Sequence, residues 1–164
     1  ICLCVISQFY VYLQKIKIIL IMKIDTEYYE RCIETLQKAF TLLQQENTDS
    51  IHYDIYRSAC IKEFELILEQ SGKLLRKVLN PYFHTSKEVG KLNFKDLFRH
   101  ANLHSLITNE ACERWMKYRD NRNTTAHDYG VGFVEETLTL LPSFISDALD
   151  LVEIIKIQNN ALKG

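Results

Sequence analysis

The sequence lacks the cysteine spacing that disulfide-stabilised and zinc-binding domains need. Its five cysteines are odd in number and scattered, with no C-x-x-C pair and no histidine at the spacing of a zinc ligand. Neither a disulfide scaffold nor a structural zinc site is predicted, and a reducing cytoplasm is the expected compartment. At 164 residues with 47% hydrophobic content, one domain can bury a sufficient core without metals or cross-links.

A strong excess of charge of either sign is also absent. The formal net charge is -1 at pH 7, so the protein has no broad basic surface. Any nucleic acid would have to be held at a local site, and duplex DNA is not expected as a partner. A phosphate loop is missing as well, because Gly90-Lys91 has neither the upstream glycine nor the following serine or threonine. No ATP site is therefore predicted.

The chain has no uninterrupted apolar run long enough to span a membrane. Its first residues are uncharged, but Lys15 and Lys17 divide the stretch, whereas a spanning helix needs about 20 consecutive apolar residues. No small-residue cleavage site indicates a signal peptide. Because Met22 directly precedes a plausible helix start, we interpret residues 1–21 as an extension upstream of the natural start and residues 22–164 as the domain. A membrane anchor is the alternative.

No segment has the pattern of a strand, and the periodicity that remains is helical. The expected long helices span residues 26–46, 54–79, from 108 or 109 to 130, and 135–156. Asn93 caps a short additional helix, Asn80-Pro81 ends the second long helix, and residues 82–91 form a loop. Pro142 either kinks the last helix or marks its true start. The sequence predicts an all-α fold, an antiparallel four-helix-type bundle with one short extra helix.

One string of residues suggests chemistry. Arg122, Asn123, His127 and Tyr129 place a cation, an amide, an imidazole and a phenol within eight residues. Histidine transfers protons near neutral pH, and the planar fork of arginine binds phosphate well. Together these groups indicate chemistry on a phosphodiester or a nucleotide. The pair Arg99 and His104 repeats the separation without the asparagine or the tyrosine, so we interpret it as accidental.

Helical geometry restricts how these groups can meet. Arg122 and His127 lie about 140° apart around a straight helix. Convergence requires a loosened helix, an arginine that wraps around it, or two copies of the chain that pool their residues across a dimer. A base, an acid and a cation in one cleft would permit metal-free RNA cleavage. The plain alternative is that Arg122 pairs with Asp120 or Asp128 and that His127 caps the helix.

A second set of polar residues lies on the second predicted helix. Glu65, Glu69 and Lys73 step by four along one face, so Glu69 and Lys73 can form an ordinary surface ion pair. No third acidic or histidine ligand completes a metal site there. Arg119, one turn before Asn123, is a candidate phosphate ligand, and a link to a neighbouring acidic side chain is the alternative. Trp115 and the phenylalanines are expected in the core.

The stretch from Trp115 to Tyr129 resembles the signature of the HEPN superfamily, whose core is arginine, a polar residue that is often asparagine, a short spacer and histidine. More narrowly, the chain from Met22 to Ile155 resembles the nucleotidyltransferase substrate-binding proteins. This closer resemblance rests on the same stretch, on Phe64-Glu65, Glu69 and Lys73-Leu74-Leu75, and on the opening from Met22 to Leu43.

The resemblance implies a helical bundle, usually a homodimer, encoded beside a minimal nucleotidyltransferase. In many such pairs the HEPN member is a metal-independent ribonuclease toxin and the transferase is its antitoxin. By this analogy Arg122 and His127 are the catalytic pair, Asn123 orients them, and Tyr129 is the tyrosine that some partner transferases modify with AMP. The alternative is a non-catalytic subunit that presents substrate to the transferase.

The resemblance also gives the face of Glu65, Glu69 and Lys73 a second role, in which it lines a groove near the motif. No cofactor is implied. The expected partners are the nucleotidyltransferase, a second copy of this chain, and RNA as a substrate.

Overall fold

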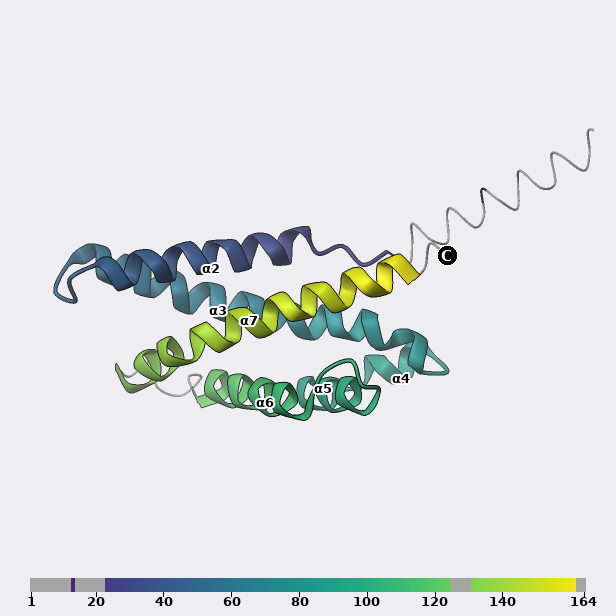
Figure 1. Ribbon diagram of the computed structural model, residues 1–164. Coiled ribbons are helices and arrows are strands. Elements are labelled where there is room, and N and C mark those ends of the chain that lie inside the picture. Colours follow the sequence, from purple (N-terminus) through teal and green to yellow (C-terminus); the bar gives the residue numbers. More distant parts are fainter. Residues whose placement is uncertain (1–12, 14–22, 125–130, 162–164) are drawn as a thin grey trace, which may run out of the picture.

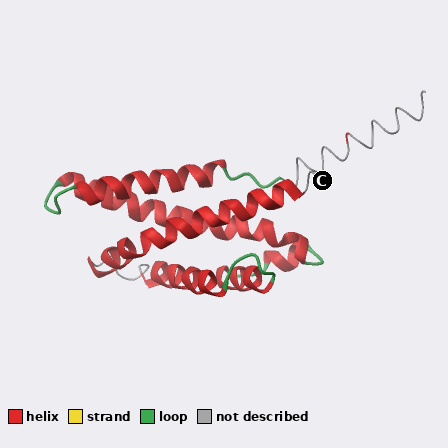
Figure 2. Ribbon diagram, viewed as in Figure 1, coloured by secondary structure: helices red, strands yellow, loops and turns green. Residues whose placement is uncertain are grey.

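The structure, a computed structural model, describes residues 13, 23–124 and 131–161. Within these residues all regular structure is helical, as Figure 2 shows, which confirms the predicted all-α fold. The helices are α2 (Glu27–Gln45), α3 (Ile51–Leu79), the 3-10 helix η1 (Asn80–Tyr82), α4 (Ser86–Gly90), α5 (Phe94–Leu103), α6 (Asn109–Thr124) and α7 (Val131–Ala161). Apart from residue 13, the predicted extension over residues 1–21 lies outside the described part of the chain.

Helix α3 begins earlier than predicted, at Ile51 instead of Asp54. Ser50 is the last residue of the polar run that follows α2. In the structure it is also the N-cap of α3, because its Oγ accepts a hydrogen bond from the Tyr53 backbone N–H at 3.0 Å. The polar run therefore ends one helix and begins the next.

The loop predicted over residues 82–91 is wrong in part, because it contains the short helix α4. The Thr85 hydroxyl caps this helix by accepting from the Glu88 backbone N–H at 3.3 Å, and Val89 anchors it in the core. A single turn with one cap and one buried residue is too short to produce a periodic signal. The predicted cap at Asn93 is confirmed, since its Oδ1 accepts from the Asp96 backbone N–H at 2.9 Å.

The last helix is longer than predicted and runs through Pro142, so this proline does not mark the helix start. Proline has no N–H to donate, so the turn at Pro142 lacks one helical hydrogen bond. Leu141 and Phe144, on either side of Pro142, are fully buried and keep this turn packed. The end of the fourth predicted helix, expected at Gly130, lies outside the described residues.

Helices α3 and α7 cross in the middle of the bundle, with α2 on one side and α5 and α6 on the other (Figure 1). In Figure 1, α3 starts beside the end of α2 and runs back in the opposite direction. Helix α7 likewise starts beside the end of α6 and runs antiparallel to it. Short connections between these pairs favour this arrangement. The bundle therefore has three layers. Helices α5 and α6 form the outer layer opposite α2.

An aromatic cluster joins the outer layer to the middle of the bundle. Trp115 of α6 is 2% exposed, and its ring lies 4.5 Å from that of Phe98, centroid to centroid. Phe144 of α7 lies 4.6 Å from Phe64 of α3 and 5.0 Å from Tyr118 of α6. Aromatic pairs at such distances add to the stabilisation that comes from burial alone. The cluster confirms the core assignment of Trp115 and fixes the position of α6.

Candidate functional site

Buried polar contacts set the rotation of α6 about its axis. The Asp147 carboxylate on α7, 3% exposed, accepts from Arg114 Nε and Nη2 at 2.8 and 2.6 Å and from Tyr118 Oη at 2.7 Å. One turn further, Asn121 Nδ2 donates to Thr137 Oγ1 at 2.8 Å. Burial, together with the Asp147 carboxylate, raises the pKa of the Tyr118 phenol above its usual value. One face of α6 is thus fixed against α7.

The motif arginines lie on another face of α6. At about 100° per residue, Arg119 and Arg122 are rotated roughly 80 to 140° from Arg114 around the helix. Arg119 contacts Phe94 on α5, and Arg122 contacts Glu65 on α3. Because a different face of α6 is held against α7, the last turns of α6 present the motif arginines towards α5 and α3.

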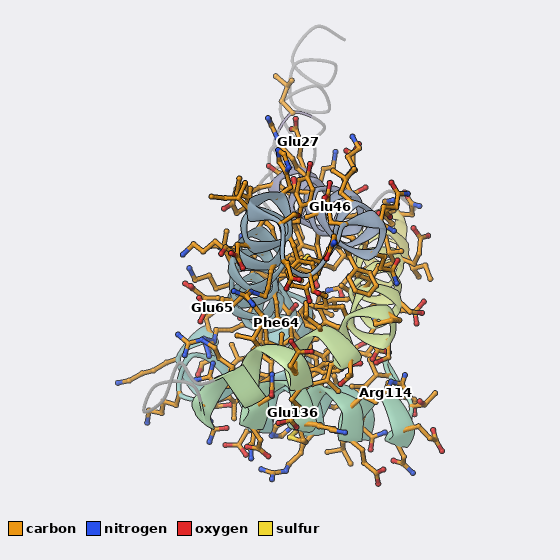
Figure 3. The ribbon with its side chains drawn as sticks, turned by 90° about the vertical axis from the view of Figure 1, so that its left-hand side faces the viewer. Glu27, Glu46, Phe64, Glu65, Arg114 and Glu136 are labelled. Atoms are coloured by element: carbon orange, nitrogen blue, oxygen red, sulfur yellow. The ribbon has the colours of Figure 1, made fainter. Side chains whose placement is uncertain are left out.

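A groove of about 370 Å³ lies between the last turns of α6 and the middle of α3. We call it the motif groove. Its polar lining comes from Lys62, Glu65, Glu69, Arg119, Arg122 and Asn123. Figure 3 shows Glu65 at one edge of the molecule, with Phe64 towards the interior and Arg114 at the opposite edge. The groove and the Arg114–Asp147 pair therefore lie on different sides of the bundle.

Arg122 is anchored in the groove by Glu65. Its Nε lies 3.0 Å from Glu65 Oε1, and the two side chains are 36% and 20% exposed. The plain alternative placed Arg122 with Asp120, which forms an ion pair with Lys95. A half-buried cation fixed by a carboxylate on another helix has a defined position, which suits the recognition of a second anion.

Arg119 contacts an aromatic ring, a partner that the sequence did not suggest. Its guanidinium carbon lies 5.3 Å from the centroid of the Phe94 ring on α5. Such stacking uses the face of the guanidinium and not its N–H groups, which lie in its plane. The stacking contact with Phe94 thus positions Arg119 at the groove and does not pair its guanidinium with a carboxylate.

The predicted surface pair on α3 is confirmed. Lys73 Nζ lies 2.7 Å from Glu69 Oε1, and both side chains are exposed. The Lys73 ammonium lowers the pKa of the Glu69 carboxyl below its ordinary value. Glu69 lines the motif groove, whereas Lys73 lines a neighbouring pocket instead. The structure thus brings Glu65 and Glu69 to the motif groove and places Lys73 at its border.

The remaining predicted site residues, His127 and Tyr129, lie outside the described residues. Their approach to Arg122 stays a prediction, and so does the alternative pairing of Arg122 with Asp128.

Sequence reasoning missed Lys62 as a lining residue of the groove. The signal was present, because Lys62 stands three residues before Glu65 and seven before Glu69, which places all three on one side of a helix. Lys62 adds a third cation to the two arginines in the groove.

The accidental copy of the arginine–histidine spacing is separate from the groove. Arg99 pairs with Asp96 at 3.0 Å, and the His104 ring lies 4.4 Å from the Tyr82 ring. Each side chain therefore has its own local partner.

Two features are absent from the described residues. These residues contain no group of three or more histidine, cysteine, aspartate or glutamate side chains that could hold a metal ion. They also contain no helix of sufficient length and hydrophobicity to cross a membrane.

The chain is similar to known proteins in sequence and in fold. Residues 25–156 match the family described as nucleotidyltransferase substrate binding protein like. The probable ribonuclease HepT of Haemophilus influenzae is 28% identical over 110 residues, which are 67% of this chain and 74% of HepT. A solved structure from the same organism, described as a substrate-binding domain of a nucleotidyltransferase, has a TM-score of 0.68 at 22% identity. That match covers 80% of this chain and 99% of the solved chain, so the two share a fold.

Proposed function

Because the chain belongs to the family of nucleotidyltransferase substrate-binding-like proteins, we propose that it is the HEPN subunit of a two-component toxin–antitoxin module. In this proposal it cleaves single-stranded RNA without a metal ion and is controlled by a partner nucleotidyltransferase. It acts in the cytoplasm as a homodimer. The similarity to the probable ribonuclease HepT supports the activity.

The observation that carries the proposal is the convergence of Arg122, Asn123, Arg119 and Lys62 in the motif groove. The groove has three cations and an amide donor against the two carboxylates of Glu65 and Glu69. Its net positive charge suits a phosphodiester. Arg122 extends from the last turns of α6 and is held by Glu65, so its guanidinium is already in place before an anion arrives.

The proposed reaction needs one general base and one general acid. A base takes the proton of the 2′-hydroxyl, whose oxygen attacks phosphorus, while an acid gives a proton to the departing 5′-oxygen. The products are a 2′,3′-cyclic phosphate and a 5′-hydroxyl. Arg122 offsets the charge on the phosphorane oxygens, and Asn123 orients the reacting groups. His127 is the proton carrier, and the second copy in a dimer supplies the second imidazole.

Tyr129 supplies the proposed regulation. Transfer of AMP from ATP to its phenol oxygen, with release of pyrophosphate, would place an anionic nucleotide two residues from His127. The added bulk and negative charge would repel RNA from the motif groove.

The test is cleavage of a mixed single-stranded RNA by purified protein in EDTA. We expect wild-type protein to cleave, and His127→Ala and Arg122→Ala to lose at least about a hundredfold in rate, since each removes one group from the transition state. Arg99→Ala is the matched control, because it removes an arginine of the same spacing outside the groove. RNA carrying 2′-O-methyl groups should resist cleavage.

Circular dichroism of each variant distinguishes lost chemistry from lost folding. Failure of folded, unmodified wild-type protein to cleave RNA would refute the ribonuclease, as would full activity of both motif variants.

A non-catalytic substrate-binding subunit is the second candidate, favoured by the description of the matching family. In that case the protein would be inert alone and would form a stable complex with the nucleotidyltransferase encoded beside it. Co-expression of both proteins with an affinity tag on the transferase tests this candidate. Failure of the two to purify together would refute it.

A further inference from the structure

A second cavity, of about 600 Å³, lies at the C-terminal end of α3 and is basic. We call it the basic pocket. Four cationic side chains line it, Lys23, Lys73, Arg76 and Lys77, and its lining contains no aspartate or glutamate. One of the four, Lys73, forms an ion pair with Glu69, which lies outside the pocket lining. In a chain with a net charge of -1, such a concentration of one sign is local and attracts anions.

Long-range hydrogen bonds hold the pocket together. The Asn159 side chain of α7 accepts from the Ile24 backbone N–H and donates to the Ile24 carbonyl, both at 2.9 Å. Gln158 Nε2 donates to the Val78 carbonyl of α3 at 3.1 Å. The end of α7 thus fixes the segment that carries Lys23 against the end of α3, so cations far apart in sequence lie in one place.

Arg76 supplies a donor that lacks an acceptor. Its Nη2 donates to the Leu92 carbonyl at 2.7 Å, which restrains the guanidinium. Its Nε is buried and has no hydrogen-bond partner among the described residues. A buried N–H without an acceptor is unfavourable. The hydrogen bond to Leu92 nevertheless holds this guanidinium, one of the four cations of the pocket, in a defined position.

The basic pocket adjoins the motif groove along α3. Glu69 lines the groove, Lys73 lines the pocket, and the ion pair between them marks the border. From Glu65, which holds Arg122, to Lys77 the distance along the helix is about 18 Å at 1.5 Å per residue. A ligand with one phosphate cannot reach both places, whereas a polynucleotide presents a phosphate at every residue.

We propose that the basic pocket binds a backbone phosphate of single-stranded RNA whose reactive bond lies in the motif groove. The pocket would hold the strand at a point distant from the reacting bond. Its four cations would contribute affinity through the phosphate, which is the same group for every base. This inference rests on the proposed RNA substrate.

The test is equilibrium binding of a fluorescent, 2′-O-methylated single-stranded RNA, which cannot undergo the proposed cleavage, to folded protein over a range of salt concentrations. The variant is Lys23→Gln/Lys77→Gln, which replaces two exposed lysines of the pocket that form no ion pair with another described residue. The matched control is Lys38→Gln/Lys117→Gln, which removes the same charge from exposed positions outside both cavities that carry the argument.

We expect the pocket variant to bind several-fold more weakly at low salt, and the slope of log affinity against log salt to fall by about 0.7, because one phosphate contact is lost. The control should match wild type. Equal binding by the pocket variant and wild type would overturn the inference. Loss of labelled ATP binding with unchanged RNA binding would also overturn it, because the pocket would then serve a free nucleotide.

The same measurement separates this inference from the proposed function. Weaker RNA binding by the pocket variant supports the pocket even if wild-type protein does not cleave RNA. Unchanged binding removes the pocket even if cleavage depends on Arg122.

Discussion

Cys60 illustrates how a single buried thiol gives the protein a dependence on pH. It is fully buried on α3, and burial raises the pKa of its thiol from 9.0 to about 11, because the thiolate would lose its hydration. The unfolded chain releases this proton at lower pH than the folded one does. The contribution of the thiol to stability is therefore fully present below pH 9 and is lost as the pH rises towards 11.

We expect the free energy of unfolding to fall across this range by an amount on the order of 2 kcal/mol from Cys60. Urea unfolding at pH values on either side of the window measures the fall. Cys60→Ala should show a shallower decrease. The buried tyrosines, whose pKa values burial raises from 10.0, add their own loss of stability above about pH 10. An identical decrease in Cys60→Ala and wild type would show that the thiol is not its source.

At the same scale, Glu65 shows why the site was only partly predictable. Its position on the helical face of Glu69 follows from the sequence, and both line the motif groove. Its ion pair with Arg122 does not follow, because the two residues are distant in the chain and meet only through the packing of α6 on α3. Lys62 was overlooked although its spacing placed it on the same face.

Among the elements, α3 depends on the cap at its first turn. The Ser50 hydroxyl satisfies the Tyr53 N–H, one of the backbone donors that a helix start leaves without a partner. We expect Ser50→Ala to lower the free energy of unfolding by about 1 kcal/mol. Ser58→Ala is the control, since Ser58 is exposed within the same helix and should change stability little. Equal effects of the two substitutions would contradict the capping role.

The long elements were predictable because each buries one apolar stripe of sufficient length. Residues 26–46 were expected for the first, and α2 spans Glu27–Gln45. Short elements and boundaries were less predictable, because a polar run such as the one before Ile51 can end one helix, cap the next, or do both. The helix at Ser86–Gly90 depends on a single buried residue, which no periodic pattern can reveal.

On the scale of the whole molecule, the Asp147 carboxylate joins the outer layer to the middle of the bundle. It accepts hydrogen bonds from Arg114 and Tyr118, so a substitution of Asp147 should change how α6 packs on α7. Because α6 also carries Arg119 and Arg122, the same change should disturb the motif groove on the opposite side of the bundle.

We expect Asp147→Asn to lower the free energy of unfolding by about 2 kcal/mol, less than for a fully buried pair because Arg114 is partly exposed and can be hydrated. Asp150→Asn, an exposed change nearby on α7, should stay within about 0.5 kcal/mol of wild type. Urea unfolding followed by circular dichroism measures both. Equal stability of the two variants would show that the contact does not hold the layers together.

The hydrogen bonds between Asn159 and Ile24 have a practical consequence for handling the protein. They bring the start of α2 and the end of α7 to the same end of the bundle, beside the basic pocket (Figure 1). A purification tag or dye attached next to either segment would sit where RNA is proposed to pass. The turn between Gln45 and Ile51 lies at the other end of α2 and is the better place for a reporter group.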